Sequence, residues 1–287
     1  MATTAFFVTD LHGKITRYKK LFREIVKEKP ACVFWGGDLL PHRMRPIEFG
    51  GKKIKHFVED YLIEELTALK AQMGDVYPEM FMILGNDDAR SEEHLFLEME
   101  NRGLCTYINQ KKVSFGAFAV FGYSFVPPTP FLIKDWEKYD VSRYVDPGCV
   151  PPTEGYRTVD PDYDPEYATI KKDLETLIGD KDLSTAIFLF HSPPYQSHHD
   201  RAALDGQTYE HVPLDVHVGS IAIKELIETH QPYITLHGHI HESSRLTGYW
   251  AQKFGKTHTF SAAWDGPELS IVKFDLENPT EAERILL

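Results

Sequence analysis

Short apolar runs alternate with stretches of helical periodicity along the chain, and this alternation predicts an α/β fold. The mostly apolar runs have the length of buried strands and cover residues 5–8, 31–35, 81–84, 186–190 and 233–236. Apolar residues recur at helical spacing over residues 14–29, 56–72, 91–100, 166–178 and 220–230. A strand, a helix and a second strand in succession are typical of a parallel βαβ unit.

The remaining segments predict shorter elements around this framework. Alternating patterns predict short strands over 104–108, 111–115, 117–123, 245–250, 256–261 and 268–275. Residues 41–55 are basic and are expected to form a loop. Periodicity disappears over about 124–166, where prolines and aromatic residues are frequent. No linker divides the chain, so we predict a single domain over residues 1–287 with an aromatic, proline-rich insertion at about 124–166.

The charge and the cysteine content restrict the environment and the partners. Lys and Arg number 31 against 43 Asp and Glu, a net charge of −12 that disfavours general binding to nucleic acid or anionic membranes. The chain has no run of apolar residues long enough to span a membrane and no basic leader segment. Its three cysteines are widely separated and form no C-x-x-C pair. These features favour a cytoplasmic protein with reduced thiols.

Polar side chains that suit metal ions follow five of the apolar runs. They are Asp10 and His12, Asp38, Asn86, His191, and His239 and His241. Residues two apart on extended backbone point to the same side, and the carboxyl ends of parallel strands meet at one edge of a sheet. Neighbouring neutral imidazoles suggest a metal site. The alternative is a set of ordinary turns and hydrogen-bonded structural histidines, which is the usual explanation for each short motif alone.

Taken in order, these motifs resemble the calcineurin-like metallophosphoesterase superfamily. The family pattern is D-x-H, G-D, G-N-H-D/E, a single H and G-H-x-H, and the chain has DLH at 10–12, GD at 37–38, GNDD at 85–88, His191 and GHIH at 238–241. The resemblance covers residues 5 to about 265. It is closer to small prokaryotic members than to the protein phosphatases, because the chain has GGDLLPHR and LGNDD at the diagnostic segments. The resemblance implies a four-layer αββα sandwich of two packed mixed sheets with flanking helices.

The resemblance also implies a dinuclear metal site that hydrolyses phosphoesters by metal-hydroxide attack. Asp10, His12 and His241 would hold one divalent cation, Asn86, His191 and His239 the other, and Asp38 would bridge both. Oxygen and imidazole ligands suit several metals. Manganese is our first choice, with iron, zinc, cobalt or nickel as alternatives. His237, two residues before His239, has no ligand role in the family pattern and is expected to be structural or to support the ligands.

The chain departs from the family pattern at one catalytic position. Asp87 stands where the family has a histidine that assists the leaving group, and Asp88 occupies the following acidic position. We keep Asp87 and Asp88 as candidate catalytic residues, although an ionised carboxylate is a poor proton donor. His42, His198 and His199 are candidate substitute donors, and ordinary surface positions are the alternative for each. The polar stretch 195–217 also contains Arg201, a candidate phosphate contact, and His217.

The sequence therefore predicts a metal-dependent phosphoesterase that acts on a small-molecule phosphodiester. The alternatives are a phosphomonoesterase or nucleotidase, and a metal-binding scaffold of the same fold with little turnover. Trp136, Tyr139 and Tyr144 of the insertion could stack on the base of a nucleotide substrate. Packing on the insertion's own domain, or burial in a homodimer interface, is the alternative for these aromatic residues.

Overall fold

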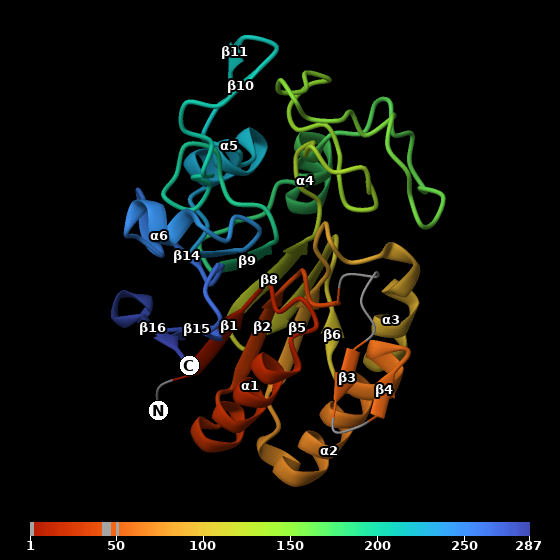
Figure 1. Ribbon diagram of the computed structural model, residues 1–287. Coiled ribbons are helices and arrows are strands. Elements are labelled where there is room, and N and C mark those ends of the chain that lie inside the picture. Colours follow the sequence, from red (N-terminus) through yellow and green to blue (C-terminus); the bar gives the residue numbers. More distant parts are fainter. Residues whose placement is uncertain (1–2, 42–46, 50–51) are drawn as a thin grey trace.

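The fold is built on two six-stranded mixed sheets, whose arrangement can be followed in Figure 1. The computed structural model describes residues 3–41, 47–49 and 52–287. The first sheet has the order β16 (Glu283–Leu286), β15 (Ser270–Asp275), β1 (Thr4–Val8), β2 (Cys32–Gly36), β5 (Glu79–Ile83) and β6 (Thr106–Tyr107). The second has the order β13 (Ala251–Phe254), β14 (Thr257–Ser261), β12 (Ile234–His237), β9 (Ala186–Phe190), β8 (Phe118–Tyr123) and β7 (Lys111–Phe115).

Parallel strands occupy the centre of each sheet. β1, β2, β5 and β6 are parallel neighbours in the first sheet, and β14, β12, β9 and β8 are parallel neighbours in the second. In the first sheet the antiparallel strands β15 and β16 lie beyond β1, and in the second the antiparallel strands β13 and β7 form the two edges. Because parallel strands are connected by helices that cover the sheet, their near-continuous apolar sequences are buried on both faces.

Alternate residues of β1 show how the layers are packed. Phe7 points to a core shared with residues of the second sheet such as Leu236, whereas Phe6 packs in a core that includes Tyr18 of the first helix. The helices of the outer layers are α1 (Ile15–Glu28), α2 (Ile63–Met73), α3 (Glu93–Asn101), α4 (Ile170–Ile178) and α5 (Ile221–His230). The chain thus forms the predicted four-layer sandwich of helices, sheet, sheet and helices.

The structure corrects several of the predicted elements. No strand covers 245–250: a short helix, α6 (Ser243–Thr247), ends there at Gly248, whose left-handed backbone (φ 79°) terminates it. The segment predicted as a loop over 41–55 contains the hairpin strands β3 (Ile47–Phe49) and β4 (Lys52–Ile54). Two further strands in the stretch 195–217, β10 (Thr208–Tyr209) and β11 (Val212–Pro213), are too short to show a periodic pattern.

The insertion is a long ordered segment without regular elements. No helix or strand is assigned from Ser124 to Thr169, and the side chain of Thr169 caps α4 by accepting a hydrogen bond from the Lys172 amide. Trp136 is buried and donates a hydrogen bond from Nε1 to the Asp88 carbonyl oxygen at 2.8 Å, and Tyr139 is only 3% exposed. The hypothesis that these two rings stack on a substrate base is therefore wrong, because both pack within their own domain. Tyr144 is exposed.

Two features bear on the predicted environment. Among the described residues, no helix is both long and apolar enough to cross a membrane. The three cysteines are free thiols, and Cys32 and Cys105 are buried. Burial raises the pKa of the Cys105 thiol to about 12, which keeps it protonated at neutral pH.

A buried ion pair fixes the first part of the insertion. Lys134 and Glu137 are both fully buried, and Lys134 Nζ lies 2.6 Å from Glu137 Oε2. Lys134 also donates to the Thr129 carbonyl oxygen at 3.0 Å, and Glu137 accepts hydrogen bonds from the Thr129 amide and hydroxyl. Burial raises the pKa of Glu137 to about 7 despite the opposing effect of Lys134.

Replacing Lys134 with Met should destabilise the protein by about 3–5 kcal/mol, because it leaves the Glu137 carboxyl buried without its cation. The free energy of unfolding from urea titrations measures this effect. Lys171→Met, which removes one partner of the exposed pair Lys171–Glu225, is the matched control and should change the free energy little. Equal effects of the two substitutions would contradict the structural role of the buried pair.

Candidate metal centre

The ends of five parallel strands bring the predicted ligands to one place. Asp10 and His12 follow β1, Asp38 follows β2 and Asn86 follows β5. His191 follows β9 of the second sheet, and the turn after β12 carries His239 and His241. The first sheet therefore contributes four of the predicted ligands and the second sheet contributes three, all from loops that follow the ends of strands. All seven residues predicted to bind metal lie here.

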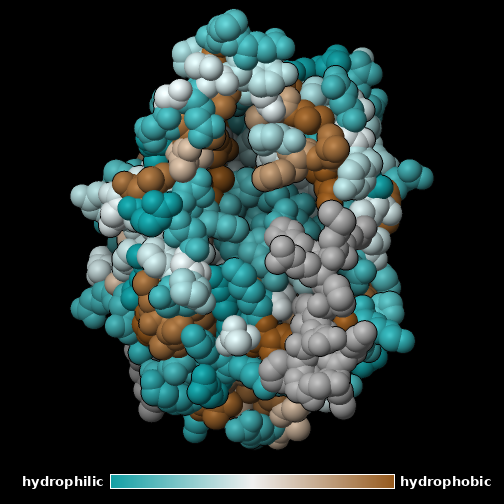
Figure 2. Space-filling view, in the orientation of Figure 1, coloured by the Kyte–Doolittle hydropathy of each residue, from teal (hydrophilic) through white to brown (hydrophobic). Residues whose placement is uncertain are grey.

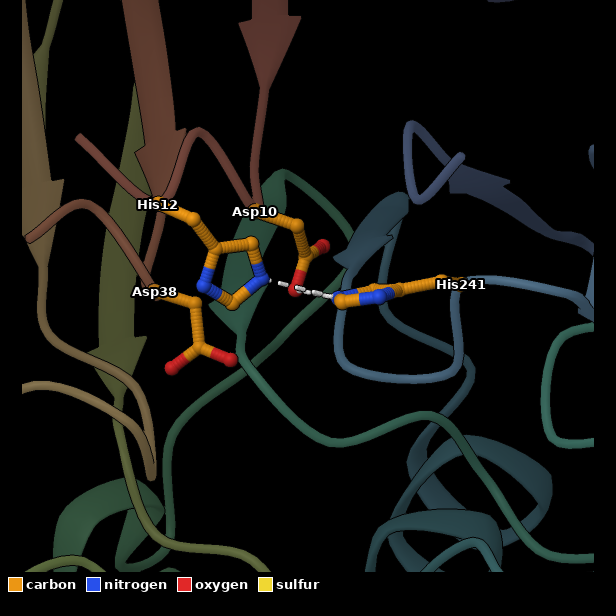
Figure 3. Close-up of side chains that lie close together, drawn as sticks. All are labelled: Asp10, His12, Asp38 and His241. Atoms are coloured by element: carbon orange, nitrogen blue, oxygen red, sulfur yellow. Dashed lines mark hydrogen bonds and ion pairs between the residues drawn. The ribbon is translucent and has the colours of Figure 1, made fainter. Parts of the chain in front are cut away.

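The first cluster consists of Asp10, His12, Asp38 and His241. One potential ligand atom from each lies within 4.8 Å of the others. His241 Nε2 lies 3.1 Å from both His12 Nε2 and Asp10 Oδ1. Figure 3 shows Asp10, His12 and Asp38 grouped together, with His241 reaching from a loop on the other side toward Asp10 and His12. Two imidazoles and two carboxylates in this arrangement suit a divalent cation.

The second cluster shares Asp38 with the first. Asp38, His191 and His239 each offer one ligand atom within 4.8 Å of the others. Asn86 joins them, because its Oδ1 lies 3.0 Å from His191 Nε2. Asp38 is 2% exposed and is the carboxylate common to both clusters. A carboxylate has two oxygens and can therefore bridge two cations.

Unusual backbone conformations direct the ligands into the site. Asp10 (φ 57°), His12 (φ 47°), Asp38 (φ 52°) and His239 (φ 73°) all occupy the left-handed region. Such a conformation is unfavourable for a residue other than glycine, at roughly 1–3 kcal/mol each, and persists only where surrounding contacts impose it. Here Asp10 N donates to the Gly37 carbonyl at 3.0 Å, and His12 N donates to the Asp38 carbonyl at 2.8 Å.

Hydrogen bonds also fix the orientation of the imidazole rings. His191 Nδ1 donates to the Gly36 carbonyl oxygen at 2.7 Å, which leaves Nε2 directed toward Asp38 and Asn86. His237 is fully buried, and both of its ring nitrogens are used, by the Ser192 carbonyl at 2.9 Å and the Thr235 hydroxyl at 2.7 Å. His237 is therefore a structural residue, as expected.

Mutual electrostatic stabilisation sets the protonation of the ligands in the metal-free protein. Burial alone would raise the pKa of Asp38, but the charge and hydrogen bond of His191 outweigh burial and hold it well below its usual range. Burial would conversely lower the pKa of His191, but Asp38 raises it to about 10. Burial lowers the pKa of His239 to about 3, so this ring is neutral at physiological pH. A cation that binds at Asp38 would replace the positive charge of His191.

The structure places the two candidate catalytic acids differently. Asp87 borders the cleft at the site, its amide donates to Asp38 Oδ1 at 2.8 Å, and its carboxylate Oδ2 lies 3.6 Å from His12 Nδ1. Asp88 is fully buried behind the ligands. Its carboxylate accepts hydrogen bonds from the amides of Leu39, Leu40 and Gly85 at 2.7–3.1 Å. Asp88 thus joins the loop that carries Asp38 to the loop that carries Asn86. A catalytic role for Asp87 or Asp88 stays a prediction.

A cleft of about 360 Å³ opens onto the candidate ligands. Its walls come from the segments 127–131 and 146–149 of the insertion and from residues 202–218, and Asp38, Asn86, His239 and His241 lie at its base. Figure 2 shows a hollow in this face of the molecule with hydrophilic residues on its floor and hydrophobic residues on its upper walls. Among the described residues that border the cleft, none is Lys or Arg.

Most of the predicted auxiliary residues lie outside this cleft. Arg201 forms an ion pair with Asp205 and does not border the cleft, so its expected phosphate contact is wrong for this conformation. His198 stacks on Tyr249 away from it. His199 is fully buried, and burial lowers its pKa to about 3, so it is neutral and cannot act as the proton donor. His42 lies outside the described residues.

Comparison with known proteins agrees with this geometry. The family model for calcineurin-like phosphoesterases matches residues 3–243, and the chain belongs to this family. A search of curated proteins found no match. One crystal structure with 15% identical residues has a TM-score of 0.59, over 100% of this chain and 99% of its own. The crystal structure of TT1561 from Thermus thermophilus has 14% identical residues and a TM-score of 0.55, over 100% and 99% of the two chains. These likenesses support the fold.

Gly85→Ala should weaken metal binding by displacing two ligands at once. A Cβ atom at Gly85 would lie 2.4 Å from Asp38 Oδ1 and 2.6 Å from His191 Cε1. We expect a loss of at least tenfold in metal affinity, measured by isothermal titration with Mn²⁺, since displaced ligand support typically costs about 10–100-fold. Gly116→Ala is the control, because it strains a left-handed turn but meets no atom within 4 Å. Unchanged affinity in the Gly85 variant would contradict the packing described here.

Metal affinity should rise with pH because bound metal requires neutral imidazole. The raised pKa of His191 means that this ring is protonated at pH 7 without metal, so binding must release its proton. We expect the affinity for Mn²⁺ to rise about tenfold per pH unit for each proton displaced, and to fall on acidification. Titration calorimetry in buffers of different ionisation enthalpy counts the protons released. His230→Ala, at the exposed end of α5, should leave this count unchanged. Binding without proton release would contradict the assignment.

Proposed function

We propose that this protein is a dinuclear metal-dependent phosphoesterase that hydrolyses a small-molecule phosphodiester. The observation that carries the proposal is the position of Asp38 in both ligand clusters. Two divalent cations held in this way would neutralise charge on a phosphoryl group and make water a stronger nucleophile near neutral pH. Asp10, His12 and His241 would hold one cation, and Asn86, His191 and His239 the other. Manganese remains our first choice for both.

The size and lining of the cleft support a small-molecule substrate. The cleft volume is within the range of small-molecule sites, and its proline-rich and aliphatic walls would exclude water from a bound ester. The absence of Lys and Arg among the described residues of the cleft means that the cations would supply its main attraction for phosphate. The net charge of −12 also disfavours a long nucleic acid substrate.

Metal analysis combined with hydrolysis assays tests this function. We expect about two metal ions per chain and Mn²⁺-stimulated hydrolysis of bis-p-nitrophenyl phosphate in preference to p-nitrophenyl phosphate. Asp38→Ala should reduce turnover by about a thousandfold or more, because the charge stabilisation supplied by the cations is worth several kcal/mol. Asp180→Ala, an exposed carboxylate after α4, is the matched control.

Three other results would each change the assignment. Preference for p-nitrophenyl phosphate would favour a phosphomonoesterase. Stoichiometric metal without hydrolysis of either ester would favour a metal-binding scaffold. A purified protein that takes up no metal would contradict the proposal.

A further inference from the structure

One imidazole other than the candidate ligands borders the cleft. Among the described residues of its lining, the ionisable groups beyond the ligands are Asp87, Asp146, Cys149, Asp215, His217 and Glu242. The usual pKa of a carboxylate lies far below neutral pH, although burial and the neighbouring Asp215 raise the pKa of Asp146. Burial raises the pKa of the Cys149 thiol to about 11. An imidazole is the side chain best suited to exchange a proton near neutral pH. His217 is therefore the strongest candidate for a proton donor in the cleft.

A buried carboxylate holds His217 in a defined orientation. His217 Nδ1 donates to Asp200 Oδ1 at 2.8 Å, and Asp200 is fully buried. The Asp200 carboxylate also accepts amide hydrogen bonds from Gln196 at 2.8 Å, Ser197 at 2.9 Å and Gly219 at 3.2 Å. These bonds fix the position of the Asp200 carboxylate. The imidazole that is hydrogen-bonded to it therefore carries a proton on Nδ1 and has a fixed orientation.

His217 borders the cleft, and among the described residues its ring is hydrogen-bonded through Nδ1 alone. The His217 side chain is 30% exposed, and its Nε2 makes no hydrogen bond within the described part of the chain. The neighbouring Asp215 accepts from the His217 amide at 2.8 Å and from the Tyr195 hydroxyl at 2.6 Å. The Tyr195 ring packs edge-on against the imidazole at 6.2 Å between centroids. Asp200 thus holds the ring through Nδ1, Asp215 holds the backbone of His217, and Tyr195 packs beside the ring.

We propose that His217 is the general acid that protonates the leaving-group oxygen, with Asp200 as its positioning residue. The proposal rests on the phosphoesterase function proposed above. The oxygen of a water molecule forms a bond to phosphorus as the bond to the leaving oxygen breaks, and the water loses one proton to solvent. The leaving oxygen keeps the bonding electron pair and takes the proton from His217 Nε2. The imidazolium becomes neutral imidazole and is reprotonated from solvent before the next cycle.

This assignment also explains how the chain can function with Asp87 after Asn86. The Asp87 carboxylate lies against His12 and its amide binds Asp38. His217 belongs to a different segment of the cleft lining, within residues 202–218, and borders the same cleft as the candidate ligands. The acid function would thus come from a different loop.

Two aryl esters that differ only in leaving-group basicity test the role of His217. Methyl 4-nitrophenyl phosphate releases a phenolate that needs little protonation, whereas methyl phenyl phosphate releases a more basic one. We expect His217→Ala to reduce kcat/KM for the phenyl ester by about 10²–10⁴-fold and for the nitrophenyl ester by less than about tenfold. Asp200→Asn should change the two esters in the same direction but less.

Metal content and inhibition by inorganic phosphate separate this effect from damage to the site, and both should be unchanged in the His217 variant. His217→Gln is a second variant of similar size in case the alanine variant does not fold. His198→Ala, outside the cleft, should leave both rates unchanged. Equal losses on the two esters, or no loss on the phenyl ester, would overturn the role of His217 while leaving the phosphoesterase function intact. Failure of the unmodified, metal-loaded protein to hydrolyse either ester would overturn both.

Discussion

The site depends on the burial of the Asp38 carboxylate at the junction of the two sheets. A buried carboxylate is unfavourable unless opposite charge and hydrogen-bond donors surround it. In the metal-free protein, His191 and the Asp87 amide supply this compensation, at 3.3 Å and 2.8 Å from the two oxygens. Because His191 belongs to the second sheet and Asp38 to the first, their contact ties the relative position of the sheets to the electrostatics of the site.

The backbone of the loops around Asp38 adopts unfavourable conformations. Four candidate ligands adopt left-handed backbone conformations. A side chain at Gly85 would collide with Asp38 and His191, and one at Gly37 would collide with His191. The Asp88 carboxylate joins the loop after β2 to the loop after β5 by accepting hydrogen bonds from three backbone amides. Strain concentrated at ligand positions is typical of sites in which geometry is held ready for a bound group.

Much of this arrangement could be predicted from the sequence. Apolar runs marked the central strands because parallel strands are buried on both faces, and the polar residue after each run marked the edge where Asp10, Asp38 and His191 meet. The helix at 243–247 and the burial of Trp136 could not be predicted, because both depend on tertiary contacts. The orientation of the His217 side chain could not be predicted from the sequence either. Its partner Asp200 lies in an irregular loop whose path follows from hydrogen bonds and not from periodicity.

The central claim is that one carboxylate, Asp38, joins two metal sites. Anomalous diffraction from crystals grown with Mn²⁺, recorded on either side of the manganese absorption edge, tests it most directly. The account predicts two anomalous peaks per chain, one among Asp10, His12 and His241 and one among Asn86, His191 and His239, with Asp38 between them. A single peak, or peaks that do not contact Asp38, would contradict it.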